Sequence, residues 1–205
     1  TSHFSLLVCV VKVNCPVIVY VVVVVCCRPL LLTTIVGDRQ PVWCLCTLNN
    51  KLYVKHGKST TIAVYNTSHQ LLFTLLRHIQ TTLSHIAHIA SCSINNCVYV
   101  SGRDTERRGV INRITTDDKL VQWLHIKNAL SLSVTSDGRV VVLIATDIQG
   151  SEGSKTYRGV VEVYNSTGVK LTKLTLPLDI VNPLRVLQIN NKSFIVCNGN
   201  NNTEL

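Results

Sequence analysis

One pattern of paired turn residues recurs along the chain and constrains its fold more than any other feature. Two short apolar runs flank such a pair about every 40 to 50 residues, a period typical of repeat folds, at Asn49-Asn50, Asn95-Asn96, Asp137-Gly138 and Asn190-Asn191. These residue types tolerate the positive φ of a tight hairpin turn. Each pair leads into a strand-like run, namely KLYVKH, CVYVSG, RVVVLIAT and KSFIVCNG. The chain therefore contains an internal repeat of β-hairpins.

A second hairpin follows the first in three of the repeats. The segments IAVYNTSHQLLFTL, INRITTDDKLVQWL and VEVYNSTGVKLTKL each hold two apolar runs around a polar turn. Four short strands in a unit of this length are typical of β-propeller blades, and the apolar spacing indicates no long helix. We expect an all-β chain with an apolar segment over residues 1–37. Residues 38–205 should form an incomplete β-propeller of four-stranded antiparallel blades, about three and a half in number.

The stretch VYNSTGVKLTKLTLPLDIVNPLRVLQINNKSFIV, residues 163–196, resembles the NHL-repeat family of β-propellers. That family includes the propellers at the C-terminus of tripartite-motif proteins, and its blades are joined through Pro-containing connectors. Asp147 matches the acidic residue that follows the second strand in the family, whereas His56 and Gly102 depart from it. Because the sequence has no zinc-binding RING or B-box pattern, ligase activity cannot be carried over from those proteins.

The N-terminal segment is almost wholly apolar, with VIVYVVVVVCC as its densest run. A membrane-spanning helix needs about 20 apolar residues, and every window of that length contains a charge and a proline, either Lys12 with Pro16 or Arg28 with Pro29. The β-branched valines favour an extended segment instead. Both interpretations stay open, and with them a membrane contact through residues 6–36. A basic start and a small-residue cleavage site are missing, so a signal peptide is not indicated.

The composition is that of a folded, basic chain. Hydrophobic residues make up 46% of the 205, enough for a buried core, and 20 Lys+Arg face 11 Asp+Glu. This balance favours attraction to anionic surfaces without selecting one. Thr1 and the lack of methionine predict a fragment of a longer protein. Four Asn-x-Ser/Thr sequons are explained by turn composition, so a cytoplasmic location is favoured while a membrane-anchored or secreted one stays open.

The cysteines, histidines and carboxylates indicate no cofactor, metal or catalytic centre. The nine cysteines include no Cys-x-x-Cys pair, the usual start of a zinc site. Cys92 and Cys97 flank a predicted two-residue turn that would place Ile94 opposite Cys97, so no disulfide is expected. The pair His85-x-x-His88 lacks a third ligand nearby. No nucleophile elbow, phosphate-binding glycine loop or carboxylate pair is present, and we expect a protein that is not an enzyme.

Binding is the function that a propeller favours, because its loops lie at two ends of a rigid scaffold. The loops between second and third strands share one end with the connectors between blades. The candidate binding residues are the basic residues of those loops: Arg103, Arg107, Arg108, Lys155 and Arg158. Eight cations accompany five carboxylates at that end, and five accompany three at the other. The sequence thus predicts positive charge spread over both ends.

We expect a non-catalytic scaffold that recognises a protein or peptide partner through one propeller face. RNA binding is the alternative, motivated by GRDTERRG at residues 102–109. The acidic residues of this loop predict internal ion pairs, and only Tyr157 among the loop residues could stack on a base. An incomplete ring also leaves apolar sheet faces open to water, which predicts self-association of the isolated chain.

Overall fold

The computed structural model describes residues 6–11, 20–25, 28–32, 42–67, 74–147, 157–177, 180, 182–190 and 193–198. In these parts of the chain every regular element is a β-strand, and the strands form five antiparallel sheets. Three sheets have four strands, one has three and one has two. The prediction of an all-β chain is confirmed.

The three four-stranded sheets are meanders whose strands pair in chain order. The first blade consists of β4 (Val42–Leu48), β5 (Lys51–His56), β6 (Thr61–Asn66) and β7 (Thr74–Gln80). The second consists of β8 (His85–Cys92), β9 (Cys97–Arg103), β10 (Gly109–Ile114) and β11 (Leu120–His125). The third consists of β12 (Ala129–Val134), β13 (Val140–Asp147), β14 (Tyr157–Tyr164) and β15 (Lys170–Thr175).

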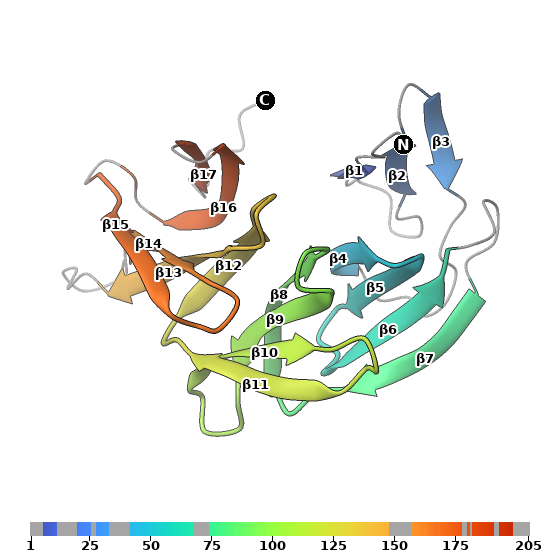
Figure 1. Cartoon of the computed structure of the whole chain (residues 1–205), viewed down its shortest axis with the longest axis horizontal. Coiled ribbons are helices and arrows are strands. Elements are labelled where there is room, and N and C mark those ends of the chain that lie inside the picture. Colours follow the sequence, from blue (N-terminus) through green and yellow to red (C-terminus); the bar gives the residue numbers. More distant parts are fainter. Residues whose placement is uncertain are drawn as a thin grey trace.

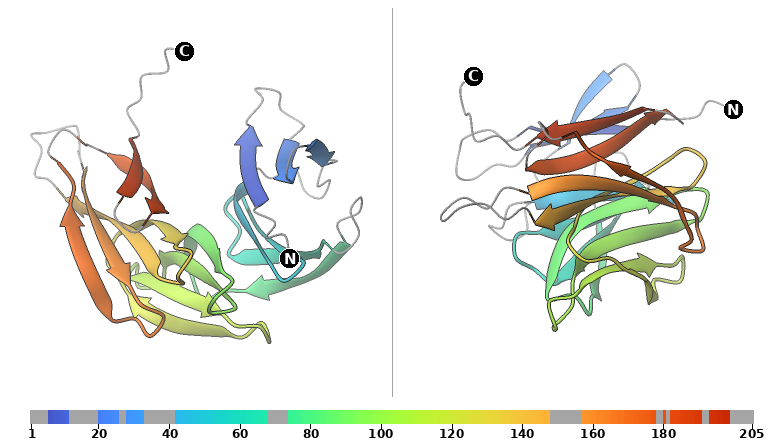
Figure 2. Two further views of the ribbon diagram at one scale, coloured as in Figure 1. Left: turned by 45° about the horizontal axis from the view of Figure 1, so that its top comes forward. Right: turned by 90° about the vertical axis from the view of Figure 1, so that its left-hand side faces the viewer.

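The blades follow one another along an open arc (Figure 1). Their first strands, β4, β8 and β12, lie against one another at the inside of the arc, and β7, β11 and β15 are the outer strands. The fourth unit consists of one hairpin, β16 (Pro183–Asn190) and β17 (Ser193–Asn198), and β16 lies against β12. Figure 2 shows the same arc from two further sides. The described chain is therefore an incomplete propeller of three blades and a half-blade, as the repeat predicts.

Hydrophobic cores lie between successive blades and hold them face to face. Ile62 of the first blade and Val100 of the second share one core, Tyr99 and Val142 share the next, and a third core joins the third blade to β16 and β17. Tyr99 and Val100 are neighbours on β9, so their side chains point to opposite faces of the sheet. Each fully buried side chain of this size contributes about 1.5–3 kcal/mol. Each blade therefore depends on its neighbours for stability.

The first pair of turn residues forms the predicted two-residue turn. Leu48 pairs with Lys51 across the hairpin, and Asn49 and Asn50 have φ values of 50° and 57°. Positive φ at both positions is what a primed turn requires, because it matches the twist of the flanking strands. The last of the four pairs lies partly outside the described residues.

The second hairpin departs from the prediction. Cys92 pairs with Cys97, so four residues connect the strands, and of the pair Asn95-Asn96 only Asn96 has a positive φ, 48°. The expectation that Ile94 lies opposite Cys97 is wrong, because a primed two-residue turn would need positive φ at both asparagines. Both thiols are free, although they lie directly across the ladder from each other.

Strands also form in the apolar N-terminal segment. β1 (Leu6–Val11), β2 (Tyr20–Val25) and β3 (Arg28–Leu32) make a three-stranded antiparallel sheet. Pro29 pairs with Val24 on the edge strand β3, where a missing N–H is tolerated. The described part of this segment has the extended conformation that valine favours, and none of the described residues belongs to a helix of the length and hydropathy that a membrane span needs. A membrane contact through residues 6–36 stays a prediction.

Candidate binding surface

Each blade presents two ends that differ in their connections. We call one end the connector face. It is formed by the β5–β6 and β9–β10 loops, by the β7–β8 and β11–β12 connectors, and by the strand ends at the same side, which include the end of β9 and the start of β14. The other, the turn face, is formed by the hairpin turns β4–β5, β8–β9, β10–β11, β12–β13 and β14–β15. The candidate binding residues that are described all belong to the connector face: Arg103, Arg107, Arg108 and Arg158. Lys155 lies outside the described residues.

Cations of the turn face are paired with carboxylates. Asp118 pairs with both Lys51, at 3.5 Å, and Arg77. The other pairs are Lys119–Asp117 at 2.8 Å, Arg139–Asp137 at 3.0 Å and Lys170–Glu162 at 3.1 Å. The Lys119 ammonium also lowers the pKa of Asp117 to about 2. Arg77, one of the eight cations expected at the end that holds the connectors, lies in β7 and belongs to this paired set.

Most cations of the connector face are unpaired among the residues that the structure describes. Arg108 pairs with Asp104 at 2.8 Å and with Glu106 at 3.0 Å, which confirms the internal ion pairing expected in this loop. Five exposed cations of this face make no ion pair with any described residue: Lys58, Arg103, Arg107, Lys127 and Arg158. The sequence predicts charge spread over both ends, but within the described residues the uncompensated charge gathers at one.

The β9–β10 loop is a tight turn that fixes its arginines in place. The Asp104 N–H donates to the Arg108 carbonyl at 3.0 Å, and the Arg107 N–H donates to the Asp104 carbonyl at 3.1 Å. The Asp104 side chain accepts two further bonds, from the N–H groups of Glu106 and Arg108, each at 2.9 Å. A loop with this many internal bonds presents its basic side chains from a defined backbone.

Arg107 occupies a backbone conformation that arginine rarely adopts. Its φ is 61°, in the left-handed region that costs a residue with a Cβ about 1–2 kcal/mol. The same five-residue turn recurs three times, with two backbone hydrogen bonds in each. The residues that take the left-handed conformation there are Asp118, Gly138 and Gly168. An arginine held at this position is a strained residue on the candidate surface, which motivates a functional hypothesis for it.

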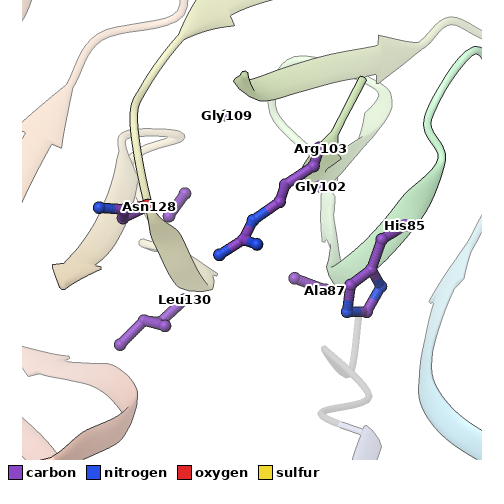
Figure 3. Close-up of a pocket in the computed structure, with 8 residues that line it drawn as sticks. His85, Ala87, Gly102, Arg103, Gly109, Asn128 and Leu130 are labelled. Atoms are coloured by element: carbon purple, nitrogen blue, oxygen red, sulfur yellow. The ribbon is translucent and has the colours of Figure 1, made fainter. Parts of the chain in front are cut away.

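A cavity of about 180 Å³ opens beside this loop, between the second and third blades. Its lining comes from β8, β9, β10 and the start of β12: His85, Ala87, Gly102, Arg103, Gly109, Asn128, Ala129 and Leu130. Figure 3 shows the Arg103 side chain extending between His85 and Ala87 on one side and Asn128 and Leu130 on the other. None of the described residues in the lining is acidic. The cavity therefore offers a guanidinium, an imidazole and an amide to an anion.

A shallower hollow of about 550 Å³ adjoins the cavity through Gly109, which lines both. The remaining lining residues of the hollow are Arg107, Arg108, His125 and Lys127. We call the cavity and the hollow together the groove. Basic side chains line both parts, and Lys127 and Arg107 of the hollow are among the unpaired cations.

Two glycines allow the close contacts on which the groove is built. A Cβ on Gly109 would lie 1.9 Å from the carbonyl oxygen of Ile126, and a Cβ on Gly102 would lie 2.1 Å from that of His85. Both obstacles are backbone atoms that hold fixed positions, so only glycine fits. The Ser84 N–H and hydroxyl donate to the Arg103 carbonyl at 2.8 and 3.0 Å. The connector thereby holds the end of β9 that carries Arg103.

Two residues of the first blade, Trp43 and Lys55, extend the site beside His85. Neither belongs to a pattern that marks it in the sequence. The Lys55 ammonium lies 4.4 Å from the centre of the Trp43 ring and donates to the Gly57 carbonyl. Trp43 in turn makes an edge contact with His85, with 6.3 Å between ring centres. Burial lowers the pKa of Lys55. Burial, with the nearby charges of Lys55 and Arg103, lowers the pKa of His85.

The site has the chemistry of anion binding. Within the described residues, no group of three His, Cys, Asp or Glu side chains is placed to hold a metal ion. His88, three residues after His85, is largely withdrawn from solvent, and burial lowers its pKa to about 4.

No protein-family model matches this sequence, and a comparison with curated proteins finds no similar one.

Proposed function

We propose that this chain is a non-catalytic propeller module that recognises a protein or peptide partner through its connector face. The observation that carries the proposal is the difference between the two faces. Each described cation of the turn face is paired with a neighbouring carboxylate, whereas Arg103, Arg107 and Lys127 line the groove without an ion-pair partner among the described residues. Unpaired charge around a concave surface attracts and orients an oppositely charged partner.

The resemblance to NHL-repeat propellers agrees with this proposal and stays a prediction. Loops on a rigid scaffold are a common place for recognition, and the bonded β9–β10 loop is such a platform. Burying Arg103 or Arg107 against a carboxylate would replace water with a charge-assisted, bidentate hydrogen bond.

RNA binding is a second candidate, and Trp43 is the observation that favours it. Its side chain is 48% exposed and lies beside His85 at the edge of the cavity, where a base could stack on the ring. Phosphate contacts by Arg103 and Arg107 would then make binding strongly dependent on salt. Each lost contact should reduce the slope of log affinity against log salt by roughly one unit or slightly less.

Selection of a random peptide library on the immobilised chain tests the proposal. Enriched peptides are then measured against two variants that each remove three positive charges. One carries R103Q, R107Q and R158Q on the connector face, and its matched control carries K119Q, R139Q and K170Q on the turn face. We expect the peptides to bind the control and to lose binding to the connector-face variant.

Equal binding by both variants, or no enrichment at all, would contradict the proposed function. A parallel selection with an RNA library addresses the alternative. Enriched RNA whose salt slope falls in the connector-face variant would replace the peptide by RNA as the partner.

A further inference from the structure

We propose that the cavity around Arg103 is a carboxylate subsite, which accepts a glutamate or aspartate side chain from an acidic peptide that continues outward past Arg107 and Lys127. This inference rests on the proposed function and names the chemistry of the partner.

The first argument is the uncompensated charge in the cavity. The Arg103 guanidinium extends into it (Figure 3), and no described carboxylate forms an ion pair with this residue. A guanidinium presents a planar fork of donors that matches both oxygens of a carboxylate. The Asn128 amide and the His85 ring supply further polar atoms in the lining. The donors of the cavity therefore fit a planar anion.

The volume of the cavity suits a small group. Pockets that enclose a drug-sized ligand usually measure about 300–1,000 Å³, and this cavity measures about 180 Å³. It is too small for a nucleotide, but it admits a group of a few atoms. Its lining contains no aromatic residue apart from the His85 ring, and Trp43 lies outside the lining, beside His85, so a base stacked on Trp43 would not occupy the cavity. A carboxylate side chain fits both the volume and the lining.

The cavity adjoins a second basic surface, the hollow. The cavity and the hollow share Gly109, and the hollow brings Arg107, Arg108 and Lys127 to the same groove. Arg108 is already engaged by Asp104 and Glu106, so Arg107 and Lys127 are the cations left to meet a partner. A chain anchored in the cavity would reach them as it leaves the inner strands. The groove is thus suited to successive acidic residues and not to one isolated anion.

The geometry also implies that binding takes up a proton at His85. The groups that face His85 are cationic or neutral: Lys55 on β5, Trp43 on β4, Arg103 on β9 and the uncharged residues at the start of β12. Burial and these charges lower its pKa in the free protein, and a bound carboxylate raises it again. The bound state holds the proton more tightly, so affinity should increase as the pH falls below the pKa of His85 in the complex.

Fluorescence anisotropy with three labelled probes of equal length tests the subsite on the full chain: hexaglutamate, hexaglutamine and hexauridine. We expect hexaglutamate to bind most tightly, and Arg103→Gln to weaken it about tenfold or more, as expected for a lost charge-assisted bond. Arg139→Gln, which removes a paired cation of the turn face, is the matched control and should bind like the parent chain. His85→Gln should remove the gain in affinity between about pH 7.5 and pH 5.5, the range in which histidine titrates.

Several outcomes would overturn the subsite: undetectable binding of hexaglutamate, equal binding of hexaglutamine, tighter binding of hexauridine, or full affinity in Arg103→Gln. Circular dichroism of each variant checks that its sheets are intact, and Arg103 is exposed enough for its loss to be tolerated. If the subsite fails while selected peptides still depend on the connector face, the proposed function stands and only its acidic chemistry is wrong. If those peptides ignore the connector face as well, both fail.

Discussion

Replacement of Gly109 by alanine should destabilise the chain more than the equivalent replacement of Gly159. The two glycines occupy matching places in the second and third blades, because each accepts a backbone hydrogen bond from the connector that follows its sheet. The Ile126 N–H donates to the Gly109 carbonyl at 2.9 Å, and the Leu176 N–H donates to the Gly159 carbonyl at 3.0 Å. What an added methyl group would meet differs between them.

At Gly109 the new Cβ would lie 1.9 Å from the Ile126 carbonyl oxygen, whereas at Gly159 it would lie 2.5 Å from the Leu176 Cδ1 and 2.7 Å from the Pro183 Cγ. The leucine methyl can rotate away and the Pro183 ring must shift, but neither change breaks a hydrogen bond. The connector backbone at Ile126 can move only by giving up its hydrogen bond to Gly109. Overpacking costs about 1–3 kcal/mol, a lost hydrogen bond about 0.5–1.5 kcal/mol, and alanine returns about 0.5–1 kcal/mol in a strand. Gly109→Ala should therefore lose about 0.5–4 kcal/mol, and Gly159→Ala roughly 0.5–1.5 kcal/mol less, since it keeps its hydrogen bond.

Urea unfolding followed by tryptophan fluorescence measures the difference. Trp123 reports on the contact between the second and third blades. Its ring centre lies 4.6 Å from that of Tyr99 in the second blade and 6.2 Å from that of Tyr164 in the third. Equal slopes of the unfolding transitions would show that the two variants unfold to comparable states. If Gly109→Ala is as stable as Gly159→Ala, the backbone contact is not what fixes the connector, and the account of how the groove is built is wrong.

Three further predictions concern single residues or one surface. Arg107→Gly should raise the free energy of unfolding by up to about 1 kcal/mol, since relief of the left-handed conformation exceeds the added freedom of the unfolded chain; a loss of stability in urea would contradict this. Because the pKa of His88 is lowered to about 4 in the folded chain, the unfolded chain binds its proton more readily, and stability should fall as the pH drops from about 6.5 towards 4; His88→Gln should flatten this dependence, measured as urea midpoints. The half-blade exposes Leu187 and Ile195 by 56% and 48%, so the chain should self-associate in size-exclusion chromatography with light scattering, and Leu187→Lys with Ile195→Lys should reduce this; a compact, cooperatively melting parent monomer would refute the open arc.

The blades could be predicted from the sequence because strand and turn chemistry are local. Alternating apolar runs and residues tolerant of positive φ recur with the period of the repeat, and they locate the hairpins β4–β5, β8–β9, β10–β11, β12–β13 and β14–β15. Turn length was less accessible, because it depends on which residues pair across the ladder. Asn95-Asn96 has the composition of a two-residue turn, but pairing stops at Cys92 and Cys97.

The candidate surface could be predicted only in part. Arg103, Arg107 and Arg108 stand out in the sequence as a basic loop, but their pairing depends on contacts that the sequence does not display. Asp118 pairs with both Arg77 and Lys51 of the neighbouring blade, and this contact is one reason why the unpaired cations of the two faces, among the described residues, lie on the connector face.

The rest of the cavity carries no local signal. His85 and Asn128 come from different blades and meet only because the inner strands pack against each other. The sequence gives no reason to separate Lys55 from the other basic residues of the strands. In the structure it is buried, with 1% of its surface exposed, and its ammonium lies over the Trp43 ring. Residues of this kind become visible only when the blades are placed side by side.

Under the proposed function, unpaired charge on one face, and not the net charge of the chain, determines binding. Two double variants separate these causes, because each lowers the net charge by the same amount. One reverses the unpaired cations Arg103 and Arg107 to glutamate, and the other reverses the paired cations Lys119 and Arg139. We predict that hexaglutamate affinity, measured by anisotropy at one salt concentration, falls more than about tenfold in the first variant and stays close to that of the parent chain in the second. An equal loss in both would show that binding follows net charge alone and would contradict the account.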